Sequence, residues 1–259
     1  MVGMPRKPVH FLLGLIGLLW GAFLATPARA VDCSNSEWQG QGYTLCAVDV
    51  TDDEMRLFLI DPGGSPYGTF SAVDSRLAGQ GKTLVFAMNA GMYHSDRSPV
   101  GHYRENGTDV QGVISNAGPG NFGMLPNGVF CFGPDHAEVI ETLAYQKRAP
   151  TDCPNATQSG PMLVIDGELH PRFLPDSTSR YIRNGVGVTA DGAKAWFVMS
   201  DAPVTFHEFG SVFRDFLKVP QALYFDGNIS RLYAPQIGRN DLGLRMGPIV
   251  GVVADRPSD

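Results

Sequence analysis

From residue 31 onward, short apolar runs alternate with polar, glycine-rich segments, a pattern typical of a chain built mainly from β-strands. The single runs predicted as strands are residues 43–50, 56–60, 82–88 and 222–225, and the predicted hairpins are residues 128–141, 162–170 and 185–200. We expect the first two runs to pair with each other. Asp166-Gly167 and Asp191-Gly192 supply the turns of the last two hairpins.

One segment departs from the strand pattern and predicts a helix over residues 205–218. Its apolar residues recur with helical spacing, and they are Phe206, Phe209, Val212, Phe213, Phe216 and Leu217. Thr205 and Glu208 have the spacing of a capping box, and Pro220 ends the helix. A weaker helix is expected near residues 70–79. The sequence therefore predicts an α+β fold, with mixed β-sheets and helices packed on them.

The first 30 residues have the pattern of a secretory signal peptide. Arg6 and Lys7 precede an apolar run at residues 11–25, and Ala28-Arg29-Ala30 has the form of a cleavage site. The alternative is a membrane anchor, but a spanning helix needs about 18 or more apolar residues. We therefore predict a signal peptide at residues 1–30 and a single domain, with room for two lobes, at residues 31–259, periplasmic or secreted.

Charge and composition narrow the range of partners. The chain has 43% hydrophobic and 18% charged residues, enough for a sizeable core. Its net charge is −6, and it would be −9 without residues 1–30, which hold three basic residues and no acidic ones. No run of Lys and Arg residues occurs after residue 30. A nucleic acid or an anionic membrane surface is therefore not an expected partner.

The four cysteines, Cys33, Cys46, Cys131 and Cys153, fit disulfides in an exported chain. Three pairings are possible, and we favour Cys33–Cys46 with Cys131–Cys153 because each closes a short loop. The alternatives are a cysteine nucleophile or a zinc site. The absence of a CxxC spacing and the oxidising compartment both argue against them.

Polar and glycine residues gather where the predicted strands begin or end, which is where many folds hold functional groups. They are Asn89, Gly91, Tyr93, Ser159, Gly160, Arg180, Arg183, Asp201, Asp226 and Gly227. Each also has a plainer interpretation as a turn or capping residue, and Glu208 fits a helix cap better than a catalyst. The metal-binding HExxH motif, the GxSxG motif and the P-loop motif are absent from the sequence.

Five segments in this order resemble the phosphodiester glycosidase family: FAMNAGMY, SGPMLVIDGELH, RNGVGV, VMSD and ALYFDGNIS. The resemblance spans residues 84–230 and is greatest to the exported bacterial branch. Two motifs depart from the family pattern. Asp226-Gly227-Asn228 stands where the family has a longer glycine run, and Asn89-Ala90-Gly91 stands where it has Asn-Gly-Gly.

The resemblance implies an enzyme that cleaves a sugar from a sugar-1-phosphodiester, with a carbohydrate or phosphoglycan as its substrate. In that interpretation Arg183 holds the phosphate, while Asp226 and Asp201 stabilise the oxocarbenium-like transition state or activate water. The implied substrate-binding residues are Asn89, Gly91, Tyr93, Ser159, Gly160, Arg180 and Gly227. No cofactor is expected, although Asp201 and Asp226 have the ligand type for Ca²⁺. The alternative is a non-catalytic envelope module that binds glycans or phosphoglycans.

Overall fold

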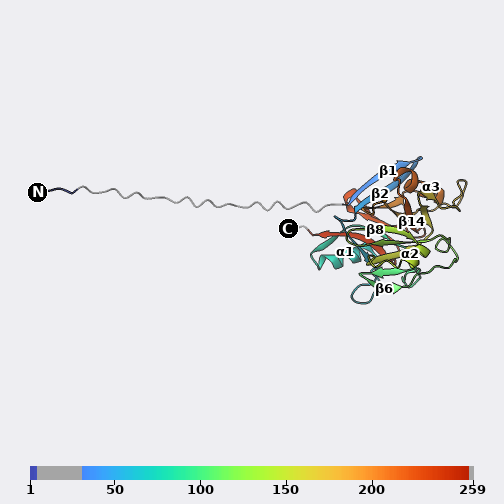
Figure 1. Ribbon diagram of the computed structural model, residues 1–259, viewed down its shortest axis with the longest axis horizontal. Coiled ribbons are helices and arrows are strands. Elements are labelled where there is room, and N and C mark those ends of the chain that lie inside the picture. Colours follow the sequence, from blue (N-terminus) through green and yellow to red (C-terminus); the bar gives the residue numbers. More distant parts are fainter. Residues whose placement is uncertain (5–30, 257–259) are drawn as a thin grey trace.

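The computed structural model describes residues 1–4 and 31–256, and the fold lies within the second range (Figure 1). The predicted signal peptide falls mainly on residues 5–30, outside the described residues. Three sheets build the fold, and every strand pairing in the described chain is antiparallel. The α+β prediction is confirmed.

The first sheet has seven strands in the order β1-β2-β13-β12-β14-β10-β11. These strands are β1 (Asp32–Trp38), β2 (Gln41–Asp49), β10 (Met162–Ile165), β11 (Glu168–Leu169), β12 (Asn184–Val188), β13 (Lys194–Ser200) and β14 (Gln221–Asp226). The second sheet runs β16-β15-β4-β17-β3. It contains β3 (Glu54–Phe58), β4 (Lys82–Asn89), β15 (Leu232–Ala234), β16 (Arg239–Asn240) and β17 (Ile249–Asp255).

The third sheet runs β6-β5-β9-β7-β8. Its strands are β5 (Tyr103–Glu105), β6 (Thr108–Gln111), β7 (Gly128–Phe132), β8 (Ala137–Glu141) and β9 (Asn155–Ser159). The helices are α1 (Phe70–Ala78), α2 (Thr142–Arg148) and α3 (Phe206–Ser211), followed by a π-helical turn (Val212–Phe216) and a 3-10 turn (Pro235–Ile237).

The three sheets share one central core. Phe86 of β4 packs against Phe197 of β13 with ring centroids 4.9 Å apart, and Phe130 of β7 contacts Phe197 edge-on at 5.8 Å. Phe225 of β14 lies 6.3 Å from Phe130. Because each ring is fully buried and comes from a different strand, this cluster fixes the sheets relative to one another.

The helices cover different outer faces of the sheets (Figure 1). Helix α3 and the π-helical turn pack on the first sheet, where Phe209 and Phe213 lie against Tyr224 in one buried cluster. Helix α1 covers the second sheet with Phe70 and Leu77, and α2 packs on the third. Each sheet therefore has one face in the central core and part of the other face beneath a helix.

The predicted helices and hairpins are confirmed, with one difference in geometry. The capping box of Thr205 and Glu208 is present, but the last turn widens so that the N–H of Leu217 donates to the carbonyl of Val212. The expected pairing of residues 43–50 with 56–60 is wrong. Strand β2 pairs with β1 and β13, whereas β3 pairs with β17. Strand β1 was not predicted from the sequence because this edge strand is mostly exposed and polar.

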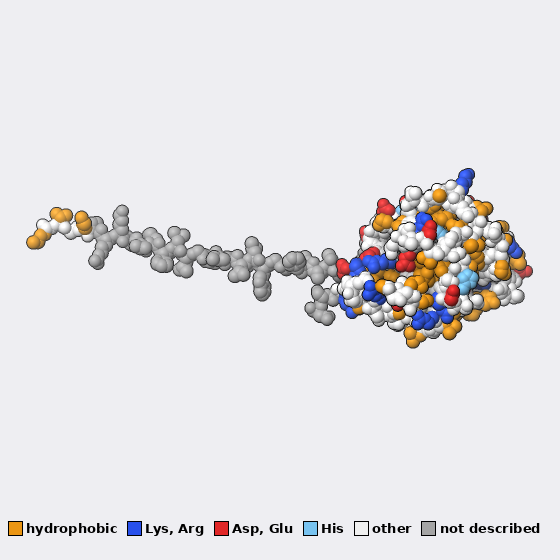
Figure 2. Space-filling view, turned by 90° about the horizontal axis from the view of Figure 1, so that it is seen from below, with side chains coloured by type: hydrophobic (Ala, Val, Ile, Leu, Met, Phe, Trp, Pro, Cys, Tyr) orange, Lys and Arg blue, Asp and Glu red, His pale blue; other side chains and the backbone are white. Residues whose placement is uncertain are grey.

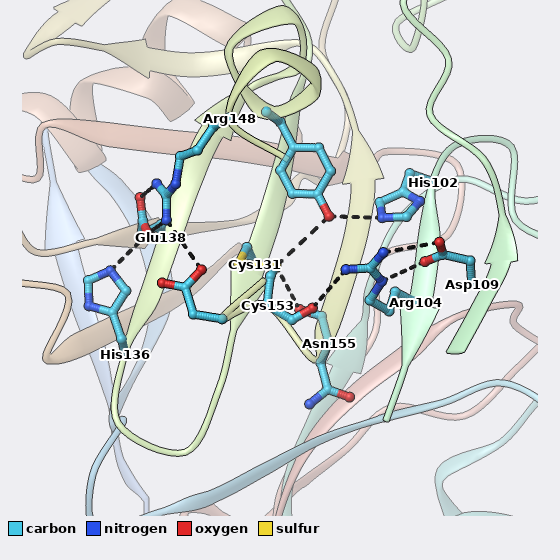
Figure 3. Close-up of a disulfide and its surroundings, with 11 residues drawn as sticks. His102, Arg104, Asp109, Cys131, His136, Glu138, Arg148, Cys153 and Asn155 are labelled. Carbon is cyan, nitrogen blue, oxygen red and sulfur yellow. Dashed lines mark hydrogen bonds and ion pairs between the residues drawn. A yellow bond between two sulfur atoms is a disulfide. The ribbon is translucent and has the colours of Figure 1, made fainter. Parts of the chain in front are cut away.

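Both predicted disulfides are confirmed. Cys33 and Cys46 face each other across β1 and β2. Cys131 of β7 is joined to Cys153, which precedes β9, so this bridge ties the chain beyond α2 back to the third sheet (Figure 3). The described residues contain no free cysteine.

Removal of the Cys131–Cys153 bridge, by Cys131→Ala with Cys153→Ala, is expected to lower the free energy of unfolding by about 3 kcal/mol, because the bridge closes a loop of 22 residues. The melting temperature should fall by roughly 6–12 °C. The matched control removes Cys33 and Cys46, which close only 13 residues between strands already paired. Thermal unfolding of both double variants checks this, and an equal loss in the two would contradict it.

Charged side chains of both signs are scattered over the face shown in Figure 2, with apolar side chains between them. This distribution agrees with the absence of Lys/Arg runs in the sequence. No helix within the described residues is long and apolar enough to cross a membrane.

Candidate active site

A cavity of about 490 Å³ opens at the end of β14. Its walls come from segments that are far apart in the chain: residues 92–100 after β4, residues 119–122, residues 179–181 before β12, and residues 224–228. Tyr93, Asn121, Ser179, Tyr181, Tyr224 and Asp226 supply most of its polar groups. The cavity is therefore lined mainly by connecting segments that meet at the end of β14.

Asp226 is the acidic group of this cavity. It is the last residue of β14, and only 8% of it is exposed. Its Oδ1 accepts hydrogen bonds from the N–H groups of Gly227 (2.6 Å) and Asn228 (2.9 Å). Burial raises the pKa of the carboxyl, and the main-chain N–H groups oppose that rise. Oδ1 is thus anchored by main-chain donors, and the N–H of Ile229 also acts on the carboxyl.

Tyr224 and Arg183 leave polar atoms unpaired beside this carboxylate. The hydroxyl of Tyr224 and Nη1 of Arg183 are buried and have no hydrogen-bond partner among the described residues. The guanidinium lies 5.5 Å from the centroid of the Tyr224 ring. Arg183 and Asn121 both come close enough to lower the pKa of the Tyr224 hydroxyl against the larger effect of burial, but neither contact has the geometry of a hydrogen bond. Buried polar atoms without partners are rare and commonly await a ligand or water.

Arg183 itself is fully buried behind the cavity wall. Its guanidinium stacks on Phe206 at 3.6 Å, Nε donates to the carbonyl of Val204 (2.9 Å), and Nη2 donates to that of Ser179 (3.1 Å). Burial lowers its pKa. Because Ser179 and Tyr224 line the cavity and Arg183 does not, the structure does not show the direct phosphate fork expected from the sequence.

Asp201 lies outside the cavity, contrary to the expectation that it joins Asp226. Its side chain is 41% exposed, forms an ion pair with Arg239 (3.0 Å) and accepts a hydrogen bond from Thr44 (3.2 Å). Among the residues of the described range, no three His, Cys, Asp or Glu side chains gather as metal ligands. A position at the end of a strand was not enough to predict whether the side chain of Asp201 lines the cavity.

Asn89 is a structural neighbour of the site and is not in its lining. It pairs with Asn184, whose Nδ2 donates to Oδ1 of Asn89 at 2.8 Å, and both side chains are fully buried. Oδ1 of Asn184 in turn accepts the N–H of Asp226 at 3.2 Å. This amide pair joins the second sheet to the first and holds the strand end that bears Asp226. Sequence reasoning missed Asn184.

Two of the other predicted binding residues line the cavity, namely Tyr93 and Gly227. The phenol of Tyr93 donates to the carbonyl of Arg245 (3.2 Å). Burial, and to a lesser extent the negative charge of Asp226, raises the pKa of this phenol. A Cβ on Gly227 would lie 2.0 Å from the hydroxyl of Tyr224. Only glycine therefore lets the tyrosine occupy its place beside Asp226.

The remaining predicted residues support the walls or lie elsewhere. Ser159 is buried and donates to the carbonyl of Phe225 (2.8 Å), and Gly160 packs against Asn127. Gly91, with φ +134°, allows a close approach to Thr157. Arg180 forms a surface ion pair with Glu208 at 2.7 Å. None of these four lines the cavity.

A larger hollow of about 600 Å³ beside the third sheet has no buried, unpaired side-chain polar atom among its lining residues. Arg104 forms two hydrogen bonds to Asp109, and Nε2 of His102 lies 3.0 Å from the hydroxyl of Tyr145. Its principal polar side chains thus satisfy one another. We therefore take the cavity at Asp226 as the candidate active site.

Comparison with known proteins shows the family to which the chain belongs. The family model described as phosphodiester glycosidase matches residues 82–245, a range that contains Asn89, Arg183 and Asp226. The chain belongs to the phosphodiester glycosidase family. A relative of this chain, the Escherichia coli K12 protein YigE, is 34% identical over 235 residues, covering 90% of this chain and 87% of YigE.

Solved structures share the fold at low sequence identity. The catalytic domain of zebrafish N-acetylglucosamine-1-phosphodiester alpha-N-acetylglucosaminidase, auto-inhibited by its pro-peptide, superposes with a TM-score of 0.58 at 12% identity, covering 86% of this chain and 81% of that one. A Synechocystis protein gives a TM-score of 0.57 at 13% identity, covering 89% of this chain and 64% of its own. Phosphodiester glycosidase-like architecture is thus retained across distant sequences.

Proposed function

We propose that the protein hydrolyses a sugar-1-phosphodiester in the cavity at the end of β14, with Asp226 as the catalytic carboxylate. The observation that supports this most strongly is a buried carboxylate that main-chain N–H groups hold in the lining of the cavity, next to two unpaired polar atoms. Family membership supplies the reaction class. The zebrafish enzyme is named for an N-acetylglucosamine phosphodiester, but at 12% identity its sugar does not transfer to this chain.

In the proposed reaction the bond between the anomeric carbon and the phosphodiester oxygen breaks. The oxygen leaves with the phosphate, which is stable as an anion and needs no proton from the protein. Positive charge develops at the anomeric carbon, and the carboxylate of Asp226 stabilises it as nucleophile or as base for the incoming water. Water supplies the new hydroxyl of the sugar, and its second proton passes to the carboxylate and then to solvent.

Arg183 is a positioning residue in this proposal. Its charge lies directly behind Ser179 and Tyr224, where it favours an anion in the cavity without touching it. The hydroxyl of Tyr224 is the group placed to donate to a phosphate oxygen. The leader pattern and the two disulfides support a periplasmic or secreted location for this activity.

The second candidate is a module that binds phosphoglycans without cleaving them. It is favoured by the shortened glycine loop at Asp226-Gly227-Asn228 and by the lack of direct access to Arg183. In this alternative, the hydroxyl of Tyr224 would recognise a phosphate and Asp226 a sugar hydroxyl.

Hydrolysis in ¹⁸O-labelled water separates these functions. With a chromogenic sugar-1-phosphodiester, we expect residues 31–259 to release sugar that carries the label at its anomeric hydroxyl, because the carbon–oxygen bond breaks. Mass spectrometry of both products gives the result. Label in the phosphate would indicate a phosphodiesterase instead, and calorimetric binding without turnover would support the module.

A further inference from the structure

A second, smaller cavity of about 110 Å³ lies between the start of α1 and the loop that follows β16. Its lining includes Ser71, Arg231, Asn240, Asp241 and Gly243. It shares no lining residue with the cavity at Asp226. The two are nevertheless neighbours, because the charge of Arg231 acts on the pKa of the Tyr93 phenol, which lines the larger one.

Arg231 is the unusual residue of this small cavity. Only 8% of it is exposed, yet its guanidinium has no hydrogen-bond or ion-pair partner within residues 31–256. Gly243 closes over it, since a Cβ there would lie 2.3 Å from Nη2, and the glycine has φ +143°. A buried, unpaired guanidinium is costly to the fold unless an anion accompanies it. Burial accordingly lowers the pKa of Arg231.

The start of α1 adds donors to the same cavity. Thr69 caps the helix by accepting the N–H of Ala72, and no acidic side chain occupies the first turn of this nine-residue helix. The N–H groups of Phe70 and Ser71 have no acceptor among the described residues. Such free N–H groups carry the positive end of the helix dipole.

The carboxylate of Asp241 also lines the cavity, and its oxygens already have hydrogen-bond and ion-pair partners. It accepts the N–H of Leu232 at 2.9 Å and lies 3.3 Å from Nε of Arg239. Asp241 therefore forms no ion pair with Arg231, although its negative charge raises the pKa of that guanidinium against the larger effect of burial. Ser71 and Asn240 add side chains that can donate to an oxyanion.

We propose that Arg231 and the N-terminus of α1 form a second anion site, which binds one tetrahedral phosphate group. A guanidinium that lines the same cavity as the first residues of a helix suits phosphate oxygens, and the volume accommodates a single such group. The phosphate is either the free ion or a second phosphate on a larger ligand that also reaches Asp226. The site does not depend on the proposed hydrolysis.

Thermal unfolding with inorganic phosphate tests the site at constant ionic strength. If the dissociation constant is about 1 mM, 10 mM phosphate should raise the melting temperature by roughly 3–6 °C. Arg231→Gln should abolish the rise. Arg76→Gln, which removes an exposed arginine from the other end of α1, should leave it unchanged. No rise in the unaltered protein, or a full rise in Arg231→Gln, would overturn the proposal.

Ser71→Asp provides a second variant that does not alter a buried group. Ser71 is exposed in the first turn of α1, so an acid there mimics the bound anion beside Arg231. We expect a higher melting temperature without phosphate and a rise with phosphate reduced to less than half. An undiminished phosphate response would count against the site even if Arg231→Gln failed to fold.

Two substrates distinguish the sources of the phosphate. If the site binds a second phosphate of the ligand, Arg231→Gln should raise KM for a sugar linked through pyrophosphate by roughly tenfold and leave KM for a monophosphodiester unchanged. If it binds free phosphate, neither KM should change while the thermal response is lost. Asp226→Asn should keep the phosphate response, so that failure of the proposed hydrolysis and failure of this site give different results.

Discussion

Asp226→Asn is expected to lower kcat for a sugar-1-phosphodiester by roughly 10²- to 10⁴-fold, since the amide can neither attack the anomeric carbon nor take a proton from water. The fold should remain, because the amide oxygen still accepts the N–H groups that anchor Oδ1. Steady-state kinetics measure the loss, and Asp135→Asn, at an exposed acid, is the control. Equal activity in both variants would exclude Asp226 from the chemistry.

The raised pKa of Asp226 gives this prediction a pH dependence. Activity needs the ionised carboxylate, so kcat should fall on the acid side through a pKa above that of an ordinary aspartate. Because the folded protein holds the proton more tightly than the unfolded chain, the carboxylate destabilises the fold as pH rises through that value. Asp226→Asn should therefore melt higher than the unaltered protein at pH 7, and this advantage should vanish in acid.

Asn184→Ala is expected to lower the free energy of unfolding by about 4 kcal/mol and kcat by roughly 10²-fold. It leaves Nδ2 of Asn89 and the N–H of Asp226 without their partner. The carboxylate then loses the contact that fixes the end of β14. Chemical denaturation and steady-state kinetics on the same preparations measure the two losses.

The control for Asn184 is Asn116→Ala, at an exposed loop position, where we expect little change. A purely structural role would reduce stability and leave kcat intact once the protein is folded. A positioning role lowers kcat at temperatures well below the melting point of the variant. A variant with normal kcat under those conditions would contradict our account of how Asp226 is held.

Local sequence signals predicted the elements well because their causes are local. The capping box at Thr205, the Asp-Gly turns and the apolar runs all act within a few residues. Pairing between distant strands depends on the whole core. Strand β3 therefore joined β17, near the other end of the chain, instead of its neighbour β2. The polar edge strand β1 offered no apolar run to identify it.

The candidate site was predicted in part. Asp226, Tyr93 and Gly227 do line one cavity, and Arg183 lies just behind it. Asp201 also follows a strand, but its partner is Arg239, on a strand of another sheet that no local pattern could link to it. Tyr224 could have been found, because it stands two residues before Asp226 and alternate residues of a strand share a face. Asn184 gave no comparable signal.

The acid of this cavity ends a strand, whereas much of the surrounding wall comes from connecting segments at residues 92–100, 119–122 and 179–181. Connections tolerate insertion and replacement far better than paired strands do. Remodelling of these segments would therefore change which ligand the cavity accepts while the carboxylate at the strand end stays in place.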